Sequence, residues 1–193
     1  VHAEMVDEEE TRDALVKSIE EMQDMVERTL AFARGMAISE PPETIELGQF
    51  LTELKRDMLN AFRLETDTPF EIKLRPQSMR RALRNVIENA VRYGDDVEVT
   101  YSRESDKALI WVRDHGPGIP DTQLEEVFEP FYRVEASRSR ETGGTGLGLS
   151  IARTILRSHG GDITLQNHPD GGLLVRLDLP FSQSSNQQER TRS

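Results

Sequence analysis

The chain has 193 residues and carries 24 Lys and Arg against 35 Asp and Glu, a formal net charge of −11. Binding to a nucleic-acid backbone needs a concentrated basic surface, so this charge argues against nucleic acid as the main partner. There is no cysteine, which excludes disulfides, Cys-based metal sites and thiolate catalysis. No apolar run approaches the ~20 residues that cross a bilayer. The length of the chain suits either one large core or a small module joined to a domain of about 150 residues.

Residues 1–36 are expected to be helical, because neither glycine nor proline precedes Gly35. Apolar positions from Leu15 onward follow a 4-3-4-3-4 spacing that makes one seam along a helix. The same spacing also suits a single amphipathic helix packed on its own domain. Gly35 and the two prolines that follow it indicate a linker over residues 37–43 rather than a tight helical turn, which favours a homodimer formed through residues 8–35.

Residues 44–181 mix strand and helix patterns, whereas residues 182–193 are rich in Ser, Gln and Arg, have almost nothing to bury and are expected to be disordered. Short apolar or alternating runs predict strands at Thr44–Leu47, Phe70–Leu74, Val97–Tyr101, Ala108–Val112, Ile163–Leu165 and Leu173–Leu179. Apolar stripes at helical spacing predict helices over Gly48–Phe62, from Pro76 through Tyr93, and from Ser150 onward. This order predicts an α+β fold, a two-layer α/β sandwich whose antiparallel-rich sheet carries helices on one face.

Three polar residues of the helix that ends at Tyr93 share one face, because Asn85, Asn89 and Arg92 stand at i, i+4 and i+7. An amide oxygen is an acceptable Mg²⁺ ligand, Mg²⁺ would bridge phosphate oxygens, and Arg92 would neutralise further charge. The face therefore suits a phosphate-bearing ligand with a hard metal ion, although an ordinary solvated helix face has the same composition.

A carboxylate and two glycines follow an apolar strand in the segment Asp114–Pro120, Asp-His-Gly-Pro-Gly-Ile-Pro. The carboxylate can accept a hydrogen bond from an exocyclic amine, and Gly116 and Gly118 would let a ligand approach the backbone closely. The alternative is that Asp114 only organises a turn. His115 is not expected to bind a metal, because no second His or carboxylate stands at ligand spacing.

Two aromatic residues, Phe128 and Phe131, precede a polar segment, residues 137–142, that has little reason to be ordered alone. The aromatic rings would anchor the base of this segment, which suggests a mobile lid. A surface loop with a hydrophobic foot is the ordinary alternative, but long loops without secondary structure are often functional.

The segment Gly143–Leu149, Gly-Gly-Thr-Gly-Leu-Gly-Leu, stands directly before the helical run that begins at Ser150. Glycines before a helix let backbone N–H groups converge on an anion, and the helix N-terminus adds a partial positive charge. The segment therefore predicts a phosphate-binding loop, although a helix-entry loop without a ligand uses the same residues.

These four motifs, in this order, resemble the N, G1, F and G2 boxes of two-component sensor histidine kinases. Residues 44–181 resemble the catalytic and ATP-binding domain of these kinases, which has the Bergerat fold shared by gyrase, heat-shock protein 90 and MutL-type ATPases. Residues 8–35 resemble the second helix of the dimerisation and histidine-phosphotransfer hairpin, most like that of osmosensing EnvZ-type kinases. Residues 1–36 would thus be part of that hairpin.

The resemblance implies that the protein binds ATP and Mg²⁺ and transfers the γ-phosphoryl group to a histidine, for relay to an aspartate in the receiver domain of a response regulator. It also implies a cytoplasmic kinase core that belongs to a longer protein, anchored in the inner membrane by a segment upstream of this chain.

By this resemblance, Asn89 would coordinate Mg²⁺, Asn85 would support the phosphate side, and Asp114 would accept a hydrogen bond from the adenine amino group and so select adenine over guanine. The other nucleotide-binding residues that the first two motifs would supply are Arg92, Tyr93, Gly116, Gly118 and Ile119. Those that the last two motifs would supply are Phe131, Arg133, Arg138, Gly144, Thr145, Gly146, Leu147 and Gly148.

One departure within the wider superfamily concerns the reaction. Hydrolysing relatives carry a catalytic glutamate one helical turn before the metal-binding asparagine, and this chain has Asn85 there, whose amide cannot act as a general base. Activation of water is therefore disfavoured, and the resemblance instead implies transfer to a histidine. A hydrolysing ATPase of the same fold and a non-catalytic nucleotide-sensing dimerisation scaffold are the alternatives.

A second departure concerns the phosphoryl acceptor. Sensor kinases carry it in a His-Glu/Asp-Leu-Arg-Thr-Pro segment, and the sequence contains no such segment. His2 is followed by Ala-Glu-Met, and we do not expect it to be the acceptor. The chain is therefore expected to bind ATP with Mg²⁺ and to autophosphorylate poorly or not at all.

Overall fold

The computed structural model describes residues 40–65, 67–134 and 145–181, which all fall in the second of the two units of the chain, Ile38–Ser193. The strands are β1 (Glu43–Glu46), β2 (Arg63–Glu65), β3 (Glu71–Leu74), β4 (Glu98–Arg103), β5 (Lys107–Arg113), β6 (Asp162–Asn167) and β7 (Leu173–Pro180). The helices are α2 (Leu47–Asp57), α3 (Pro76–Tyr93) and α5 (Gly148–Ser158), with short 3₁₀ turns η1 (Asp121–Gln123) and η2 (Glu126–Phe128). The expected helices of residues 1–36, the first part of the expected linker and the C-terminal tail lie outside the described residues.

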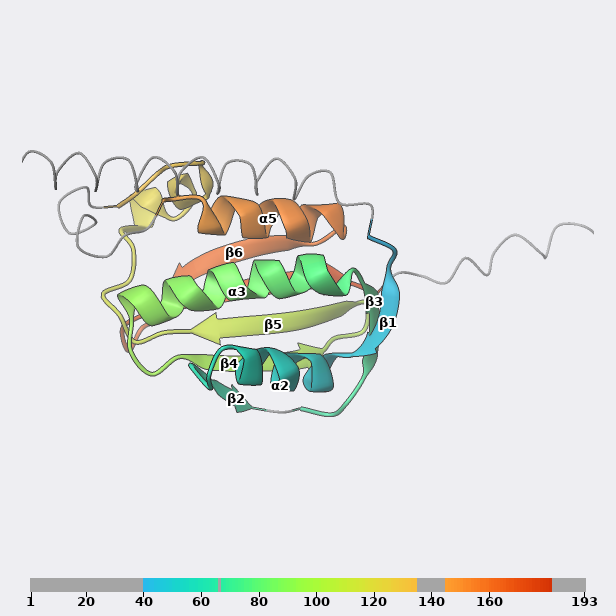
Figure 1. The fold of residues 1–193 in the computed structure, drawn as a ribbon. Helices are drawn as coiled ribbons and strands as arrows, with labels where there is room; N and C mark the ends of the chain where they lie inside the picture. The colour runs from blue at the N-terminus through green and yellow to red at the C-terminus, as the bar shows by residue number, and fades with distance from the viewer. Residues whose placement is uncertain (1–39, 66, 135–144, 182–193) are drawn as a thin grey trace, which may run out of the picture. The chain divides into compact units, whose positions relative to one another are not determined.

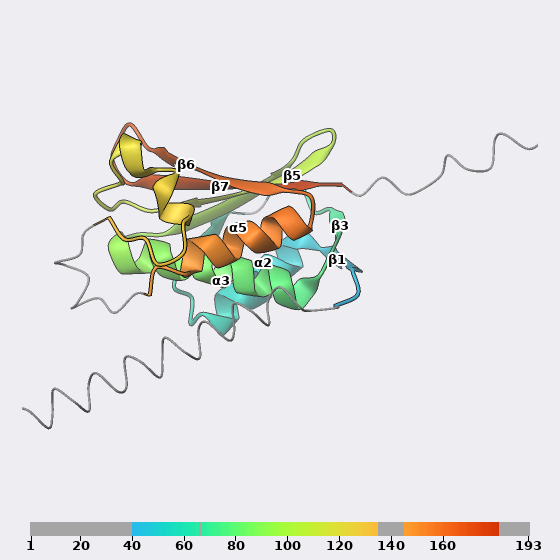
Figure 2. The same ribbon diagram turned by 90° about the horizontal axis from the view of Figure 1, so that it is seen from above.

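The main sheet has five strands in the order β2-β4-β5-β7-β6, and a separate two-stranded ribbon pairs β1 with β3 (Figure 1). Neighbouring strands run antiparallel, except that β2 and β4 are parallel. Figure 2 shows that α2, α3 and α5 all cover the same face of this sheet. The prediction of an α+β two-layer sandwich with an antiparallel-rich sheet is therefore confirmed.

The core lies between the sheet and the apolar stripe of α3. In the register of the sheet, Leu177 pairs with Ile110 on one side and with Ile163 on the other, and all three side chains are 0% exposed. The matching buried residues of α3 are Met79, Ala82, Leu83, Val86, Ile87 and Ala90. Each fully buried Leu or Ile contributes about 1.5–3 kcal/mol from the apolar surface removed from water. Within the residues that the structure describes, no helix is long and apolar enough to span a bilayer.

The helix predicted over Gly48–Phe62 is shorter than expected, because it ends at Asp57. Leu59 and Asn60 follow with φ angles of 54° and 59°, which break the helix, and Leu59 is 91% exposed. The chain then enters β2, which pairs with β4 and was not predicted. The apolar spacing of this stretch also fits a helix. A strand of three residues is too short to show an alternating pattern, so β2 is defined only by its pairing with β4.

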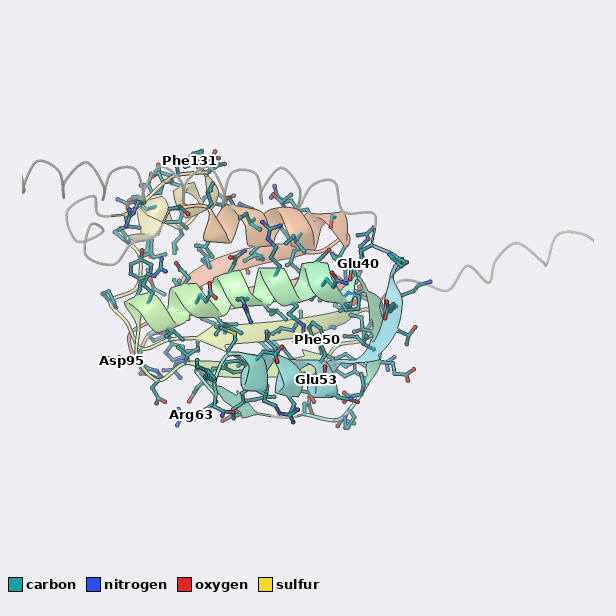
Figure 3. All side chains as sticks on the ribbon, viewed as in Figure 1. Glu40, Phe50, Glu53, Arg63, Asp95 and Phe131 are labelled. Atoms are coloured by element: carbon teal, nitrogen blue, oxygen red, sulfur yellow. The ribbon has the colours of Figure 1, made fainter. Side chains whose placement is uncertain are left out.

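The carboxylate of Glu40 caps the N-terminus of α3, beside which Figure 3 shows it. Oε1 accepts a hydrogen bond from the N–H of Gln77 at 2.7 Å, and Oε2 accepts from the N–H and the hydroxyl of Ser78 at 3.0 and 2.8 Å. Burial acts to raise the pKa of Glu40, but these hydrogen bonds outweigh it and hold the pKa below its ordinary value. The helix begins at Pro76 as predicted, and two of its unpaired N–H groups are satisfied from the segment before β1.

A neutral histidine joins the C-terminal end of α5 to the N-terminal end of α3. Nε2 of His159 accepts a hydrogen bond from the N–H of Arg75 at 3.0 Å, while Nδ1 donates to the carbonyl oxygen of Ile155 at 2.8 Å. The guanidinium of Arg75 donates to the carbonyl oxygen of Ser158 at 3.1 Å. Burial lowers the pKa of His159 and outweighs the opposing effects of the Ile155 carbonyl and the Glu40 carboxylate.

We expect this histidine to make the stability of the domain fall on mild acidification. The pKa of His159 is about 6.5 in the unfolded chain and lower in the folded one, so the unfolded state binds the proton more readily. The free energy of unfolding therefore has its full value above about pH 6.5 and decreases as the pH falls toward the folded pKa. His159→Gln keeps a donor and an acceptor without titrating, and it should flatten this dependence in urea denaturation between about pH 5 and 8.

His115→Gln is the matched control, because His115 is exposed and lies outside this junction. It should retain the pH dependence of the unsubstituted chain. An equally steep dependence in His159→Gln would contradict the assignment.

Candidate functional site

The described parts of the four motifs meet at one end of the helical layer, where α3 ends and α5 begins (Figure 1). A methyl group added at Gly148 would lie 3.8 Å from Cβ of Asn85, and one added at Gly146 would lie 2.8 Å from the carbonyl carbon of Phe131. Phe131 also donates its N–H to the carbonyl oxygen of Gly146 at 3.1 Å. The glycine segment therefore contacts both the asparagine helix and the aromatic segment.

Asp114 follows β5 directly and is only 5% exposed. Its Oδ1 accepts hydrogen bonds from the N–H of Gly116 at 2.9 Å and from the N–H of Leu173 at 3.1 Å. Both donors use the same oxygen, so neither of them engages Oδ2. A buried carboxylate held in this way can accept a hydrogen bond from a ligand without first reorganising.

Three glycines surround this aspartate where no side chain would fit. A methyl group at Gly94 would lie 2.6 Å from Cβ of Asp114, one at Gly116 would lie 2.4 Å from the carbonyl oxygen of Tyr93, and one at Gly172 would lie 1.8 Å from the carbonyl oxygen of Asp114. The sequence analysis assigned Gly116 to the site but missed the other two. Gly94 directly follows α3 and Gly172 lies in the turn before β7. In the sequence, each therefore looks like a glycine that only ends a helix or forms a turn.

The face of α3 that carries Asn85 and Asn89 has one buried polar group without a partner among the described residues. Nδ2 of Asn85 is buried and has no hydrogen-bond partner in the described part of the chain. A buried amide donor without a partner is costly, so this atom fits an acceptor supplied by a ligand, such as a phosphate oxygen. Asn89, one turn further along, is half-buried, whereas Arg92 and Tyr93 are exposed at the end of the helix.

The N-terminus of α5 lacks a side-chain cap, because Leu147 stands at the capping position and makes no such hydrogen bond. Its first N–H groups are therefore available to an anion, with the favourable end of the helix dipole behind them. Gly146 has a φ of +71°, which glycine adopts without strain, and Leu147 is buried at 2% exposure. Thr145 is half-buried just before this turn.

The remaining predicted site residues lie in the turn at Phe131, beside the end of β6, or outside the described part of the chain. Phe131 is 48% exposed with a φ of 68°, in the turn where Figure 3 labels it, and Arg133 is half-buried shortly after it. Gly118 and Ile119 contact Asn167 at the end of β6. Arg138, Gly144 and the expected lid over residues 137–142 lie outside the described residues.

A metal ion at this site would need some of its ligands from a bound phosphate compound or from water. The residues that the structure describes contain no group of three or more His, Asp or Glu side chains able to hold one. An amide oxygen from α3 together with phosphate oxygens and water is a donor set that Mg²⁺ accepts. The described residues of this site therefore fit Mg²⁺ bound together with a phosphate ligand.

Residues 75–183 match the family model of the histidine kinase-, DNA gyrase B-, and HSP90-like ATPases. The chain therefore belongs to this ATPase family, as the four motifs predicted. The match spans α3, the Asp114 segment and α5, which carry the candidate site residues.

The chain is similar to sensor histidine kinases. GtrS of Pseudomonas aeruginosa is 31% identical over 184 residues, covering 93% of this chain and 38% of that protein. CpxA of Escherichia coli is 38% identical over 118 residues, covering 61% of this chain and 26% of that protein. The chain thus spans well under half the length of these curated relatives.

Solved structures similar to this chain are also those of histidine kinases. The histidine kinase domain of the E. coli osmosensor EnvZ is 31% identical, with a TM-score of 0.59 and coverage of 81% of this chain and 99% of that one. The mycobacterial sensor histidine kinase MprB is 26% identical, with a TM-score of 0.59 and coverage of 72% of this chain and 97% of that one. The described domain is a histidine-kinase ATP-binding domain, and the expected family resemblance is confirmed.

Substitutions at two adjacent glycines test how tightly the backbone encloses Asp114. Gly171 and Gly172 have φ angles of +90° and +89°, but nothing lies within 4 Å of a methyl group at Gly171. Gly171→Ala should therefore lower the free energy of unfolding by about 1 kcal/mol through backbone strain alone. Gly172→Ala should lower it by at least about 2–3 kcal/mol, because the backbone at Asp114 must also move. Urea denaturation measures both values, and equal losses would contradict this account.

Proposed function

We propose that the described domain binds ATP with Mg²⁺ where α3, α5 and the segment after β5 meet, and that the intact protein uses it to phosphorylate a histidine. The observation that carries the proposal is the combination of a buried carboxylate at Asp114, an unsatisfied buried amide at Asn85 and an α5 N-terminus without a side-chain cap. A ligand with an amine donor at one end and phosphate oxygens at the other would satisfy all three. Membership of the ATPase family supports adenine nucleotide as that ligand.

At the base end, Asp114 would accept a hydrogen bond from the adenine amino group. The N–H groups of Gly116 and Leu173 orient its carboxylate before a ligand arrives. Guanine presents a carbonyl at the corresponding position, which would face the carboxylate without a proton between them and so bind more weakly. Gly116, Gly118 and Ile119 would let this loop approach the nucleotide, and the exposed ring of Tyr93 would lie along the base.

At the phosphate end, Asn89 would hold Mg²⁺ together with phosphate oxygens, and Asn85 would donate its unpaired N–H to a phosphate oxygen. When bound, Mg²⁺ would neutralise part of the phosphate charge. The other residues proposed to contact the phosphates from the glycine segment are Gly144, Thr145, Gly146, Leu147 and Gly148. Arg92 and Arg133 would add positive charge, as would Arg138, and Phe131 would support the segment that follows it.

Asn85 also bears on the type of reaction. The amide of an asparagine does not accept a proton near neutral pH, so it cannot activate a water molecule as a glutamate would. The domain would therefore position the γ-phosphoryl group for another nucleophile rather than hydrolyse ATP. That is the division of labour expected of a kinase domain, in which binding and electrostatics supply most of the catalysis.

The names of the relatives support proposals for the whole protein. Residues 1–36 would belong to dimerisation and histidine-phosphotransfer helices, with the homodimer formed through residues 8–35, and residues 37–43 would link them to the catalytic domain at residues 44–181. The phosphorylated histidine would pass its phosphoryl group to a response-regulator receiver domain. The intact protein would be anchored in the inner membrane, with this part on the cytoplasmic side.

Nucleotide binding tests the two ends of the site separately. Asp114→Asn should weaken binding of Mg²⁺-ADP by about 10- to 100-fold, because a charge-assisted hydrogen bond is lost and the amide presents a donor to the base. Asn89→Ala should weaken binding mainly when Mg²⁺ is present, since it removes a proposed metal ligand. Isothermal titration calorimetry with and without Mg²⁺ distinguishes the two effects.

Matched controls exist for both substitutions. Asp170→Asn changes a carboxylate whose side chain is 82% exposed in the turn before β7, and Glu88→Ala removes an exposed neighbour of Asn89 on α3. Both should bind like the unsubstituted chain. Unchanged affinity in Asp114→Asn and Asn89→Ala together would refute the site assignment.

Phosphoryl transfer is tested by supplying the acceptor. Incubated with γ-labelled ATP, the chain alone should gain little label, whereas a separately supplied helical hairpin that contains the acceptor histidine should gain acid-labile, base-stable label. Label on His2 would contradict the proposal that the acceptor is not in this chain. Sustained release of free phosphate would favour a hydrolysing ATPase, and nucleotide binding without any transfer would favour a non-catalytic scaffold.

A further inference from the structure

Asn167, the last residue of β6, makes a set of hydrogen bonds that the four motifs do not explain. Its Oδ1 accepts from the N–H of Ile119 at 2.9 Å, while its Nδ2 donates to the carbonyl oxygen of Ile119 at 2.7 Å and to Oδ1 of Asp121 at 2.8 Å. One amide therefore holds both backbone groups of a single residue and the start of η1. This uses both of its N–H donors.

The segment Asp114–Pro120 passes close to the Asn167 amide at Gly118. Gly118 has a φ of +72°, and a methyl group on it would lie 2.5 Å from Oδ1 of Asn167. A side chain at position 118 would push the amide away, and the backbone conformation would also be strained. Gly118, the second glycine of the Asp-x-Gly-x-Gly motif, thus makes room for Asn167, in addition to the close approach to the nucleotide proposed above.

The two ends of the loop are held by paired strands. At its start, Asp114 accepts from the N–H of Leu173 on β7, and at its far end Ile119 is held by Asn167 on β6. Asn167 and Leu173 are partners in the β6–β7 ladder. One hairpin therefore fixes both ends of the segment that, under the proposed function, presents Asp114 and Gly116 to the base.

We propose that Asn167 is a positioning residue for base recognition, an inference that rests on the proposed function of this site. Asn167 acts through the loop and does not need to touch the nucleotide. Without its amide, the segment from Gly116 to Ile119 keeps its anchor at Asp114 but loses the one at Ile119, so it spends less time in the binding-competent conformation. The apparent affinity for the base falls in proportion to that loss.

The test separates positioning from simple stabilisation by using three probes. Asn167→Ala should weaken Mg²⁺-ADP about tenfold, as expected for the loss of a loop anchor of a few hydrogen bonds, and should reduce the preference for ADP over GDP. Its affinity for inorganic tripolyphosphate with Mg²⁺ should not change, because that probe has no base. Uniform weakening of all three probes, or no change in any, would overturn the proposal.

Gln166→Ala is the matched control. Gln166 is the preceding residue of β6, is exposed, and points to the opposite face of the sheet by strand alternation. It should bind all three probes like the unsubstituted chain. Failure of the unsubstituted chain to bind Mg²⁺-ADP would overturn the proposed function and this inference together, whereas normal binding by both the unsubstituted chain and Asn167→Ala would overturn the inference alone.

A second variant reaches the same contact while leaving Asn167 in place. Gly118→Ala should weaken Mg²⁺-ADP because its methyl group displaces the Asn167 amide. In the Asn167→Ala background the same substitution should cost less affinity, since the oxygen it would strike is gone. Equal fold-changes in the two backgrounds would overturn the proposed contact, and the cooperativity of urea unfolding reports whether each variant is folded.

Discussion

A carboxylate cannot be buried without hydrogen-bond donors, and Asp114 obtains them from the backbone N–H groups of Gly116 and Leu173. This requirement shapes the surrounding chain. The backbone must approach the aspartate from the end of α3, from its own loop and from the turn before β7, and glycine stands at each approach. The position of the carboxylate thus links β5, β7 and α3, and a change at any one of them would move the group proposed to recognise the base.

The two ends of the helices α3 and α5 differ in how their polar groups are satisfied. At one end, Glu40 caps α3 and His159 ties Arg75 to the last turn of α5, so the polar groups there are satisfied within the protein. At the other end, the amide of Asn85 and the N-terminus of α5 have no such partners among the described residues. A helical layer whose polar groups are satisfied at one end and unsatisfied at the other suits a site that a ligand completes.

Local patterns were sufficient for the elements with a clear period or boundary residue. Pro76 correctly marked the start of α3, and short apolar or alternating runs located the strands other than β2. The sequence did not reveal β2, because a three-residue strand is defined by its pairing with β4 rather than by its own residues. It also did not reveal the hydrogen bonds between Asn167 and Ile119, because these residues lie 48 positions apart and meet only when the sheet is assembled. Motif spacing predicted the residues that are proposed to face the ligand, whereas the residues that hold that part of the chain in place emerged only from tertiary contacts.

The use of amides also addresses the conflict between a net charge of −11 and a polyanionic ligand. Asp114 is the only buried carboxylate among the described residues, and it lies on the loop after β5 rather than on α3. The α3 face instead carries Asn85 and Asn89, whose amides provide donors and acceptors without adding negative charge. Acidic groups elsewhere on the surface are screened over about 8–10 Å at physiological salt, so the local groups decide the interaction. An acidic domain can therefore bind a nucleotide if neutral amides, an uncapped helix N-terminus and a few arginines surround the phosphates, and the same logic favours an amide over a carboxylate at Asn167, beside Asp121.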